Sequence, residues 1–179
     1  TTKALAPIVD RVMVAMPEAQ EHLKCKKEFI VTGNPVRNSM TLATKDDAKK
    51  KLGVGDMQLI LSFGGSLGAK PINEAVSGMI ARFTKNNKYY FIHATGKNGY
   101  DTTCALLKEE GIDLRNQKNV EIREYINNMD VCMAAADLVI CRSGAITLSE
   151  LQNCGKPSIL IPSPYVAENH QYHNAMTLK

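Results

Sequence analysis

The sequence predicts an α/β fold in which helices cover a doubly wound parallel sheet. Short β-rich segments alternate with amphipathic helical segments along the 179 residues, and this alternation is typical of βαβ units. Several of the β-rich segments are apolar throughout, such as QLILSF at 58–63 and DLVIC at 137–141. Strands that are buried on both faces have this composition, so we expect the Rossmann-like arrangement with helices on both sides of the sheet.

The boundaries of the expected elements follow from apolar periodicity and from the positions of glycine and proline. Strands are expected at 11–16, 28–32, 58–63, 89–95, 119–124, 137–141 and 157–162. Helices are expected over 44–52, 70–85, 100–110, 128–136, 147–154 and 168–179. Gly and Pro in GNPVR, at 33–37, end the second strand. We therefore expect a short leading segment, 1–36, followed by one α/β domain, 37–179.

The composition disfavours several classes of function. Lys and Arg total 22 against 18 Asp and Glu, a formal net charge of +4, which suits an anionic ligand or an anionic membrane surface. No basic run with interleaved aromatic residues is present, so nucleic acid is disfavoured as a partner. The five cysteines never form C-x-x-C, so neither a disulfide framework nor a zinc knuckle is expected, and core filling is the expected role of most of them.

The chain has no apolar run of the roughly 18 residues that a membrane-spanning helix needs. It also begins without Met and stops inside a helical pattern. We therefore expect a soluble piece of a larger protein.

The loop after the expected strand 58–63 has the composition of an anion site. Gly64, Gly65 and Gly68 allow the backbone to turn and to approach a ligand closely, and a helix begins near Lys70. Amide groups and the Ser66 hydroxyl would then face a phosphate. The spacing G-G-S-x-G matches neither the dinucleotide fingerprint nor the P-loop. A tight connection without a ligand is the alternative.

The segment CRSGAITLSE, at 141–150, repeats this arrangement after a second strand. Ser143, Gly144, Ala145 and Ile146 lead into Thr147, which we expect to be the helix N-terminus. Ligands of parallel sheets bind at the carboxyl ends of the strands. Two helix N-termini that meet at one crevice would suit a diphosphate better than a single phosphate.

Glu150 has two interpretations. In the first, Thr147-x-x-Glu150 is a capping box, in which each side chain satisfies a backbone amide of the first helical turn. In the second, the carboxylate accepts hydrogen bonds from both hydroxyls of a ribose, as in dinucleotide sites. The local sequence alone does not choose between them.

The segment 162–175 contains His170, Gln171, His173 and Asn174. Such donors and acceptors at the mouth of a crevice suit sugar hydroxyls, and an exposed polar helix start is the alternative. Two imidazoles with one nearby carboxylate, Glu168, are too few for a convincing metal site.

Nucleophilic catalysis finds no support in the sequence. There is no G-x-S-x-G elbow, and no cysteine has a base beside it. His93 lies within a β-rich segment, so we expect it to be a hydrogen-bonded histidine of the core.

These segments together resemble the MurG family, the bacterial UDP-N-acetylglucosamine:lipid I N-acetylglucosaminyltransferases of peptidoglycan synthesis. The resemblance rests on GNPVR (33–37), SFGGSLGA (62–69), EYINNM (124–129), ADLVICRSGAITLSE (136–150), GKPSILIP (155–162) and NHQYHNA (169–175). It implies the donor-binding half of an inverting GT-B glycosyltransferase, which transfers N-acetylglucosamine to lipid I and so makes lipid II. Residues 1–36 would be the end of the acceptor domain and the linker, and the C-terminal end of the donor domain would be missing.

The resemblance also implies roles for single residues in binding UDP-N-acetylglucosamine. The phosphates would be bound by Gly65, Ser66 and the helix start formed by Ser143, Gly144, Ala145, Ile146 and Thr147. The nucleoside would be bound by Arg37, by the backbone of Ile126 and by Glu150, and the sugar by His170 and Gln171. No cofactor and no metal are implied.

Some features of the family are absent from this chain. The catalytic base, the lipid-linked acceptor site and the membrane contact are expected in the missing acceptor domain, so this chain alone should not turn over lipid I. The full-length protein would then lie on the cytoplasmic face of the bacterial plasma membrane. Leu67 replaces the family's usual Gln beside the phosphates. Two other functions stay open: transfer of another UDP-sugar to a different glycolipid, and a non-catalytic subunit that needs a separate partner chain.

Overall fold

The computed structural model describes residues 2–23, 27–41 and 43–178. The chain divides into two compact units, Thr1–Arg37 and Asn38–Lys179. The first contains α1 (Thr2–Leu5), β1 (Val12–Val14), the 3-10 helix η1 (Pro17–His22) and β2 (Phe29–Val31). β1 and β2 pair in parallel, and the small core of this unit contains Ala6, Val12 and Val14.

The second unit has the alternating order of strands and helices that the sequence predicts. Its elements are η2 (Asn38–Thr41), α2 (Lys45–Leu52), β3 (Gln58–Phe63), α3 (Lys70–Phe83), β4 (Tyr89–Ala94), α4 (Tyr100–Glu109), β5 (Val120–Arg123), α5 (Met129–Ala135), β6 (Leu138–Cys141), α6 (Ala145–Asn153), β7 (Ser158–Leu160), η3 (Ala167–Asn169) and α7 (His170–Met176).

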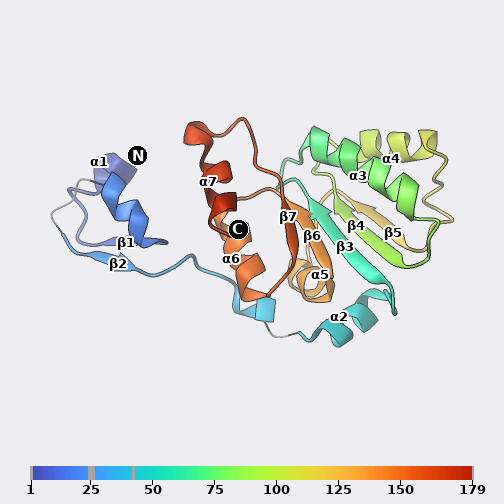
Figure 1. Cartoon of the computed structure of the whole chain (residues 1–179), viewed down its shortest axis with the longest axis horizontal. Coiled ribbons are helices and arrows are strands. Elements are labelled where there is room, and N and C mark those ends of the chain that lie inside the picture. The colour runs from blue at the N-terminus through green and yellow to red at the C-terminus, as the bar shows by residue number, and fades with distance from the viewer. Residues whose placement is uncertain (1, 24–26, 42, 179) are drawn as a thin grey trace. The chain divides into compact units, whose positions relative to one another are not determined.

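The sheet of the second unit is parallel throughout, with the strand order β5-β4-β3-β6-β7. α3 and α4 pack together on one face, and α2 and α5 pack together on the other (Figure 1). The predicted doubly wound α/β fold is therefore confirmed. From β3 the chain adds β4 and β5 on one side and then returns to add β6 and β7 on the other, so the strand order reverses once, between β3 and β6.

The central strands are apolar on both faces because both faces are covered. Ile60 and Phe91 lie in one core cluster with Ile72 and Ile80 of α3. Leu61, whose side chain alternates with that of Ile60, is also fully buried. Burial of a Leu or Ile side chain contributes roughly 1.5 to 3 kcal/mol each, so this core is the main stabilising term of the unit.

The cysteines of the core behave as expected. Cys132 and Cys141 are buried, and burial raises the pKa of the Cys141 thiol to about 12. Cys25 lies outside the described residues. Among the residues that the structure does describe, no helix is long and apolar enough to cross a membrane.

The ends of the elements differ from expectation in two informative places. α6 begins at Ala145, so the predicted helix start at Thr147 is wrong. Glu168 and Asn169 have φ angles of 53° and 50°, so α7 begins only at His170, after a kink. Lys179, the end of that expected helix, lies outside the described residues. The short helices α1, η1 and η2 were not predicted, because they are too short to show a periodicity.

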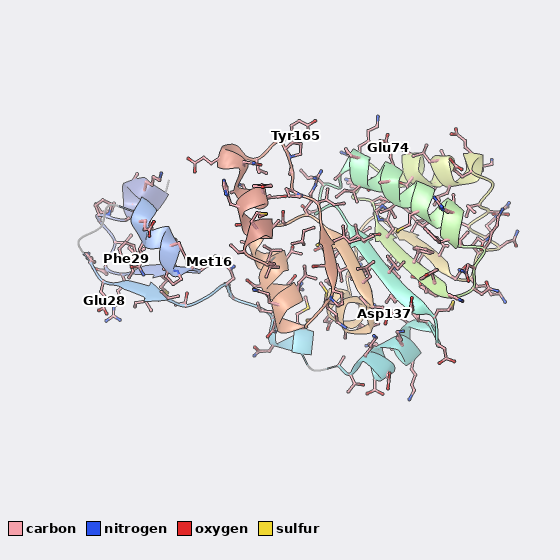
Figure 2. The ribbon with its side chains drawn as sticks, in the orientation of Figure 1. Met16, Glu28, Phe29, Glu74, Asp137 and Tyr165 are labelled. Carbon is pink, nitrogen blue, oxygen red and sulfur yellow. The ribbon has the colours of Figure 1, made fainter. Side chains whose placement is uncertain are left out.

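Asp137 fastens α2 to the sheet. Its backbone N–H donates to the Leu59 carbonyl at 2.8 Å, and its Oδ2 accepts from the Leu59 N–H at 2.8 Å. Lys49 Nζ lies 2.8 Å from the same carboxylate, and Lys45 pairs with its other oxygen. Figure 2 shows Asp137 beside α2, just before the first residue of β6. Partial burial alone would raise the pKa of Asp137, but the hydrogen bonds from both lysines outweigh it and lower the pKa to about 2.

We expect Asp137→Asn to lower the free energy of unfolding at neutral pH by about 1 to 2 kcal/mol, because the charge pairing with α2 is lost. The folded-state pKa is depressed, so this contribution is complete above the unfolded-state pKa and is lost as pH falls from about 4 to about 2. Urea unfolding of both proteins across this range measures it, with exposed Asp56→Asn as a matched control. A difference between wild type and variant that stayed constant down to about pH 2 would contradict this account.

Candidate functional site

The candidate site lies where the strand order reverses, between β3 and β6. Phe63, the last residue of β3, pairs with Cys141, the last residue of β6. The loops at 64–69 and 142–144 therefore leave the sheet side by side, and each leads directly into a helix. In open α/β sheets, ligands bind at such a reversal, outside the carboxyl ends of the strands.

The glycine-rich loop after β3 turns sharply and exposes its tip. Gly65 has a φ of 94°, and the Gly68 N–H donates to its carbonyl at 3.0 Å. Ser66 is exposed, and Leu67 is 82% exposed. Within the described part of the chain, the N–H groups of Ser66 and Leu67 donate to no other group. These amides and the Ser66 hydroxyl are available to an anion, as the sequence predicts for this loop.

Two backbone segments meet closely beneath this tip. A Cβ at Gly68 would lie 1.9 Å from the Thr95 carbonyl oxygen, and a Cβ at Gly96 would lie 2.3 Å from Gly68 N. Both glycines also have positive φ angles, which L side chains rarely adopt. The loop after β3 is therefore packed, backbone against backbone, on the loop after β4.

A buried polar chain fixes the base of the same loop. The Ser62 hydroxyl lies 2.9 Å from His93 Nδ1, and His93 Nε2 lies 3.1 Å from Asn73 Oδ1. Asn73 Nδ2 in turn donates to the Thr95 carbonyl at 3.0 Å. Burial lowers the pKa of His93 to about 4, so its imidazole is neutral near pH 7. The prediction that His93 is a hydrogen-bonded core histidine is confirmed.

The second loop delivers the N-terminus of α6 to the site. Gly144 is the N-cap residue, with extended φ and ψ, and its carbonyl accepts the first helical hydrogen bond from the Leu148 N–H at 3.0 Å. Ala145 and Ile146 follow and are exposed. The first-turn amides of a helix have no partners within the helix and carry partial positive charge. α3 follows the neighbouring strand β3, but its Pro71 has no N–H and its Ile72 N–H donates to the Ala69 carbonyl at 2.9 Å. On that side the donors are therefore the amides of the glycine-rich loop.

The structure removes one of the two interpretations of Glu150. Thr147 is the third residue of α6 and not its N-cap, and no side chain caps this helix. The predicted capping box is therefore wrong. Glu150 lies in the second turn and is 8% exposed, which is unusual for a carboxylate. Its role as a ribose ligand stays a prediction.

Ser143 and Gln171 connect α7 to the start of α6. Ser143 is fully buried, and its hydroxyl donates to the Gln171 carbonyl at 2.7 Å. Asn174 Nδ2 donates to the Ser143 carbonyl at 3.1 Å. Gln171 Oε1 accepts from the Ser163 N–H at 2.9 Å. The Ser143 hydroxyl thus positions α7 and does not face solvent, a role that the sequence did not indicate.

His170 follows the kink at Glu168 and Asn169. It is exposed, and its Nδ1 lies 2.9 Å from the Ala167 carbonyl oxygen. Positive φ angles in two consecutive non-glycine residues are costly, and they occur where the surrounding structure enforces them. His173 is also exposed. No group of three or more potential metal ligands gathers among the described residues.

The loop after β5 brings a further predicted residue to the same edge of the sheet. Ile126 is 3% exposed, whereas its neighbour Tyr125 is 62% exposed. The Gly96 N–H donates to the Glu124 carbonyl at 3.0 Å, which joins this loop to the loop after β4. Arg37 belongs to the first unit, and its role beside the nucleotide stays a prediction.

Comparison with known proteins gives a consistent family match. Residues 59–179 match the glycosyltransferase family 28 C-terminal domain. The chain is 47% identical over its whole length to the UDP-N-acetylglucosamine--N-acetylmuramyl-(pentapeptide) pyrophosphoryl-undecaprenol N-acetylglucosamine transferase of Acetivibrio thermocellus, of which it covers 47%. The protein of the same name from Ruminiclostridium cellulolyticum is 41% identical over the whole chain, which covers 48% of it. The chain thus spans about half the length of these relatives.

Solved structures show the same fold. MurG of Acinetobacter baumannii superposes with a TM-score of 0.62 at 24% identity, covering 94% of this chain and 48% of that one. The glycotransferase of kitacinnamycin superposes with a TM-score of 0.61 at 19% identity, covering 94% of this chain and 40% of that one. At these identities the likeness establishes the fold alone, which is that of GT-B glycosyltransferases.

We expect Gly68→Ala to lower the free energy of unfolding by about 1 to 3 kcal/mol, because the new Cβ would meet the Thr95 carbonyl and the positive φ would be strained. Gly78→Ala, at an exposed position of α3 with open space around it, is the matched control. That change should raise stability by about 0.5 to 1 kcal/mol, since alanine favours helices. Urea unfolding compares the two, and equal effects would show that the loop contact is loose.

Proposed function

We propose that this chain binds UDP-N-acetylglucosamine as the donor half of a glycosyltransferase. The chain belongs to the family of the glycosyltransferase family 28 C-terminal domain, which is the basis of this proposal. The observation that carries the proposal is the pair of donor groups at the sheet reversal: the exposed amides of the glycine-rich loop and the start of α6. α3 and α6 begin directly after loops that leave the paired ends of β3 and β6. A diphosphate would then accept hydrogen bonds from the glycine-rich loop on one side and from the α6 start on the other.

The chemistry of sugar transfer fits this arrangement. Negative charge develops on the β-phosphate as the bond to the anomeric carbon breaks, and fixed amides and helix dipoles aimed at that charge stabilise the transition state. In our proposal, Gly65, Ser66 and Leu67 supply amides from one side, and the α6 start at Ala145 and Ile146 supplies amides from the other. Because these groups are held by packed backbone, they need no reorganisation during the reaction.

The remaining site residues take the rest of the donor in this proposal. Glu150 accepts from the ribose hydroxyls, and the Ile126 backbone contacts the uracil. His170 and Gln171 lie at the start of α7, which Ser143 holds against the α6 loop, and they contact the N-acetylglucosamine. Support for these roles comes from their common placement at the carboxyl edge of the sheet.

The acceptor and the reaction are proposed from the relatives. Their name describes transfer of N-acetylglucosamine to N-acetylmuramyl-(pentapeptide) pyrophosphoryl-undecaprenol, the lipid-linked acceptor lipid I. In this proposal the transfer inverts the anomeric centre and yields lipid II on the cytoplasmic face of the membrane. The acceptor, the base that takes its proton and the membrane are contacted by a domain outside this chain.

Calorimetric titration tests the donor assignment directly. We expect UDP-N-acetylglucosamine to bind this chain in the presence of EDTA, with UDP-glucose and ADP-glucose binding at least about tenfold more weakly. Glu150→Gln should weaken binding about tenfold, because a charge-assisted contact to the ribose is lost. Glu109→Gln, at an exposed position of α4, is the control. Binding that is equal for all three nucleotide sugars, or no binding, would contradict the proposal.

A further inference from the structure

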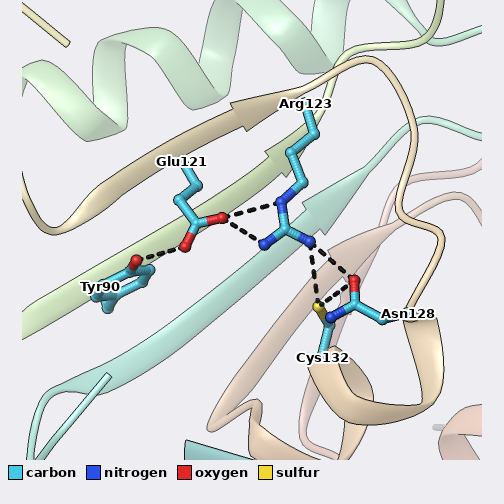
Figure 3. A network of polar contacts seen from close by, with 5 residues as sticks. All are labelled: Tyr90, Glu121, Arg123, Asn128 and Cys132. Atoms are coloured by element: carbon cyan, nitrogen blue, oxygen red, sulfur yellow. Dashed lines mark hydrogen bonds and ion pairs between the residues drawn. The ribbon is translucent and has the colours of Figure 1, made fainter. Parts of the chain in front are cut away.

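A polar network encloses the loop between β5 and α5. Its members are Tyr90, Glu121, Arg123, Asn128 and Cys132, shown in Figure 3 and called the Arg123 network below. From the sequence, only Cys132 among them has an expected role, which is core filling. They connect the interior of the sheet with the start of α5, on either side of the loop at 124–128 that contains Ile126.

The network begins at a fixed carboxylate. Glu121 and Arg123 are two residues apart on β5, so both side chains lie on the same face of the sheet. The Tyr90 hydroxyl donates to Glu121 Oε1, and Arg123 Nε donates to Glu121 Oε2 at 2.9 Å, while Nη2 pairs with the same oxygen (Figure 3). Tyr90 thus engages one carboxylate oxygen and two guanidinium N–H groups share the other, which restrains the orientation of the Arg123 side chain.

The other side of the guanidinium crosses the loop to α5. Arg123 Nη1 donates to Asn128 Oδ1 at 2.9 Å and contacts Cys132 Sγ at 3.8 Å. Asn128 is the N-cap residue of α5, yet its side chain caps no backbone amide, although Asn at this position usually does so. Its oxygen is used for Arg123 instead. The Arg123 side chain thus connects the end of β5, before the loop, to Asn128 at the end of the loop.

Backbone hydrogen bonds and burial fix the loop between these two ends. The Thr95 N–H donates to the Arg123 carbonyl at 2.9 Å, and the Gly96 N–H donates to the Glu124 carbonyl at 3.0 Å. The Ile126 side chain is 3% exposed. Because that side chain anchors the loop in the protein, the conformation of the backbone around it depends on where the two ends are held.

We propose that Arg123 is a positioning residue for the nucleobase subsite. Its side chain holds the backbone of the 124–128 loop in the conformation that contacts uracil. This inference rests on the proposed function. Arg123 contacts no ligand itself. It acts through Asn128 and Glu121. These two residues lie where the 124–128 loop, which receives the base, joins α5 and β5.

A pair of ligands separates positioning of the base from general stability. UDP and ribose 5′-diphosphate share the ribose and both phosphates and differ only in the base. We expect Arg123→Lys to weaken UDP binding about tenfold, because Lys cannot make the forked contacts, and to leave ribose 5′-diphosphate binding unchanged within about twofold. Asn128→Ala, which removes the other end of the contact, should have the same selective effect. Isothermal titration of the chain with both ligands measures it.

Arg115→Lys is the matched control, since Arg115 makes a comparable two-pronged pair with Asp113 but is exposed. It should change neither affinity. An equal loss of affinity for both ligands in Arg123→Lys, or a lower melting temperature with unchanged UDP affinity, would overturn the inference while leaving the proposed function intact. Failure of the wild-type chain to bind UDP would instead overturn both.

Discussion

The register of β3 between β4 and β6 is the constraint on which the candidate site depends. β3 ends at Phe63, which pairs with Ala94 of β4 on one side and with Cys141 of β6 on the other. Three strands therefore end at the same level, and the loops that follow them start from one line. A slip of one residue would reverse the faces of every side chain in β3 and separate the two helix starts. The buried hydrogen bond between Ser62 and His93, which lie opposite each other in the register, would be lost in such a slip and so opposes it.

Buried polar contacts convert this shared level into fixed loop positions. His93 and Asn73 join β3, β4 and α3 beneath the glycine-rich loop. Ser143 joins the α6 start to α7, and Arg123 joins β5 to α5. Each contact ties a strand end, or the loop that follows it, to another element. A buried polar group that loses its partner costs about 1 to 3 kcal/mol, so each loop has one strongly favoured arrangement.

Much of this arrangement follows from the sequence, because local patterns determine it. Apolar runs locate the strands, and Gly65 with Ser66 marks the exposed glycine-rich loop without reference to any other part of the chain. The first residue of α6 was harder to predict, since Gly144 and Thr147 are both acceptable N-cap residues. Only the backbone angles of Gly144 and the Leu148 hydrogen bond decide between them.

Contacts between distant segments were outside the reach of such patterns. The Ser143 hydroxyl reaches Gln171, which is 28 residues away, and no periodicity relates the two. Likewise, a kink at Glu168 and Asn169 depends on left-handed backbone angles that non-glycine residues rarely adopt. The Arg123 network was missed because its role appears only when β5 and α5 are placed beside each other.

We propose above all that the glycine-rich loop and the α6 start, side by side at the sheet reversal, bind one diphosphate. Titration of the isotope-labelled chain with UDP-N-acetylglucosamine, followed by amide NMR shifts, tests it most directly. The account predicts that the amide signals of Ser66 and Ile146 shift together and saturate at the same ligand concentration. Saturation of other signals while either of these two stayed unchanged would contradict it.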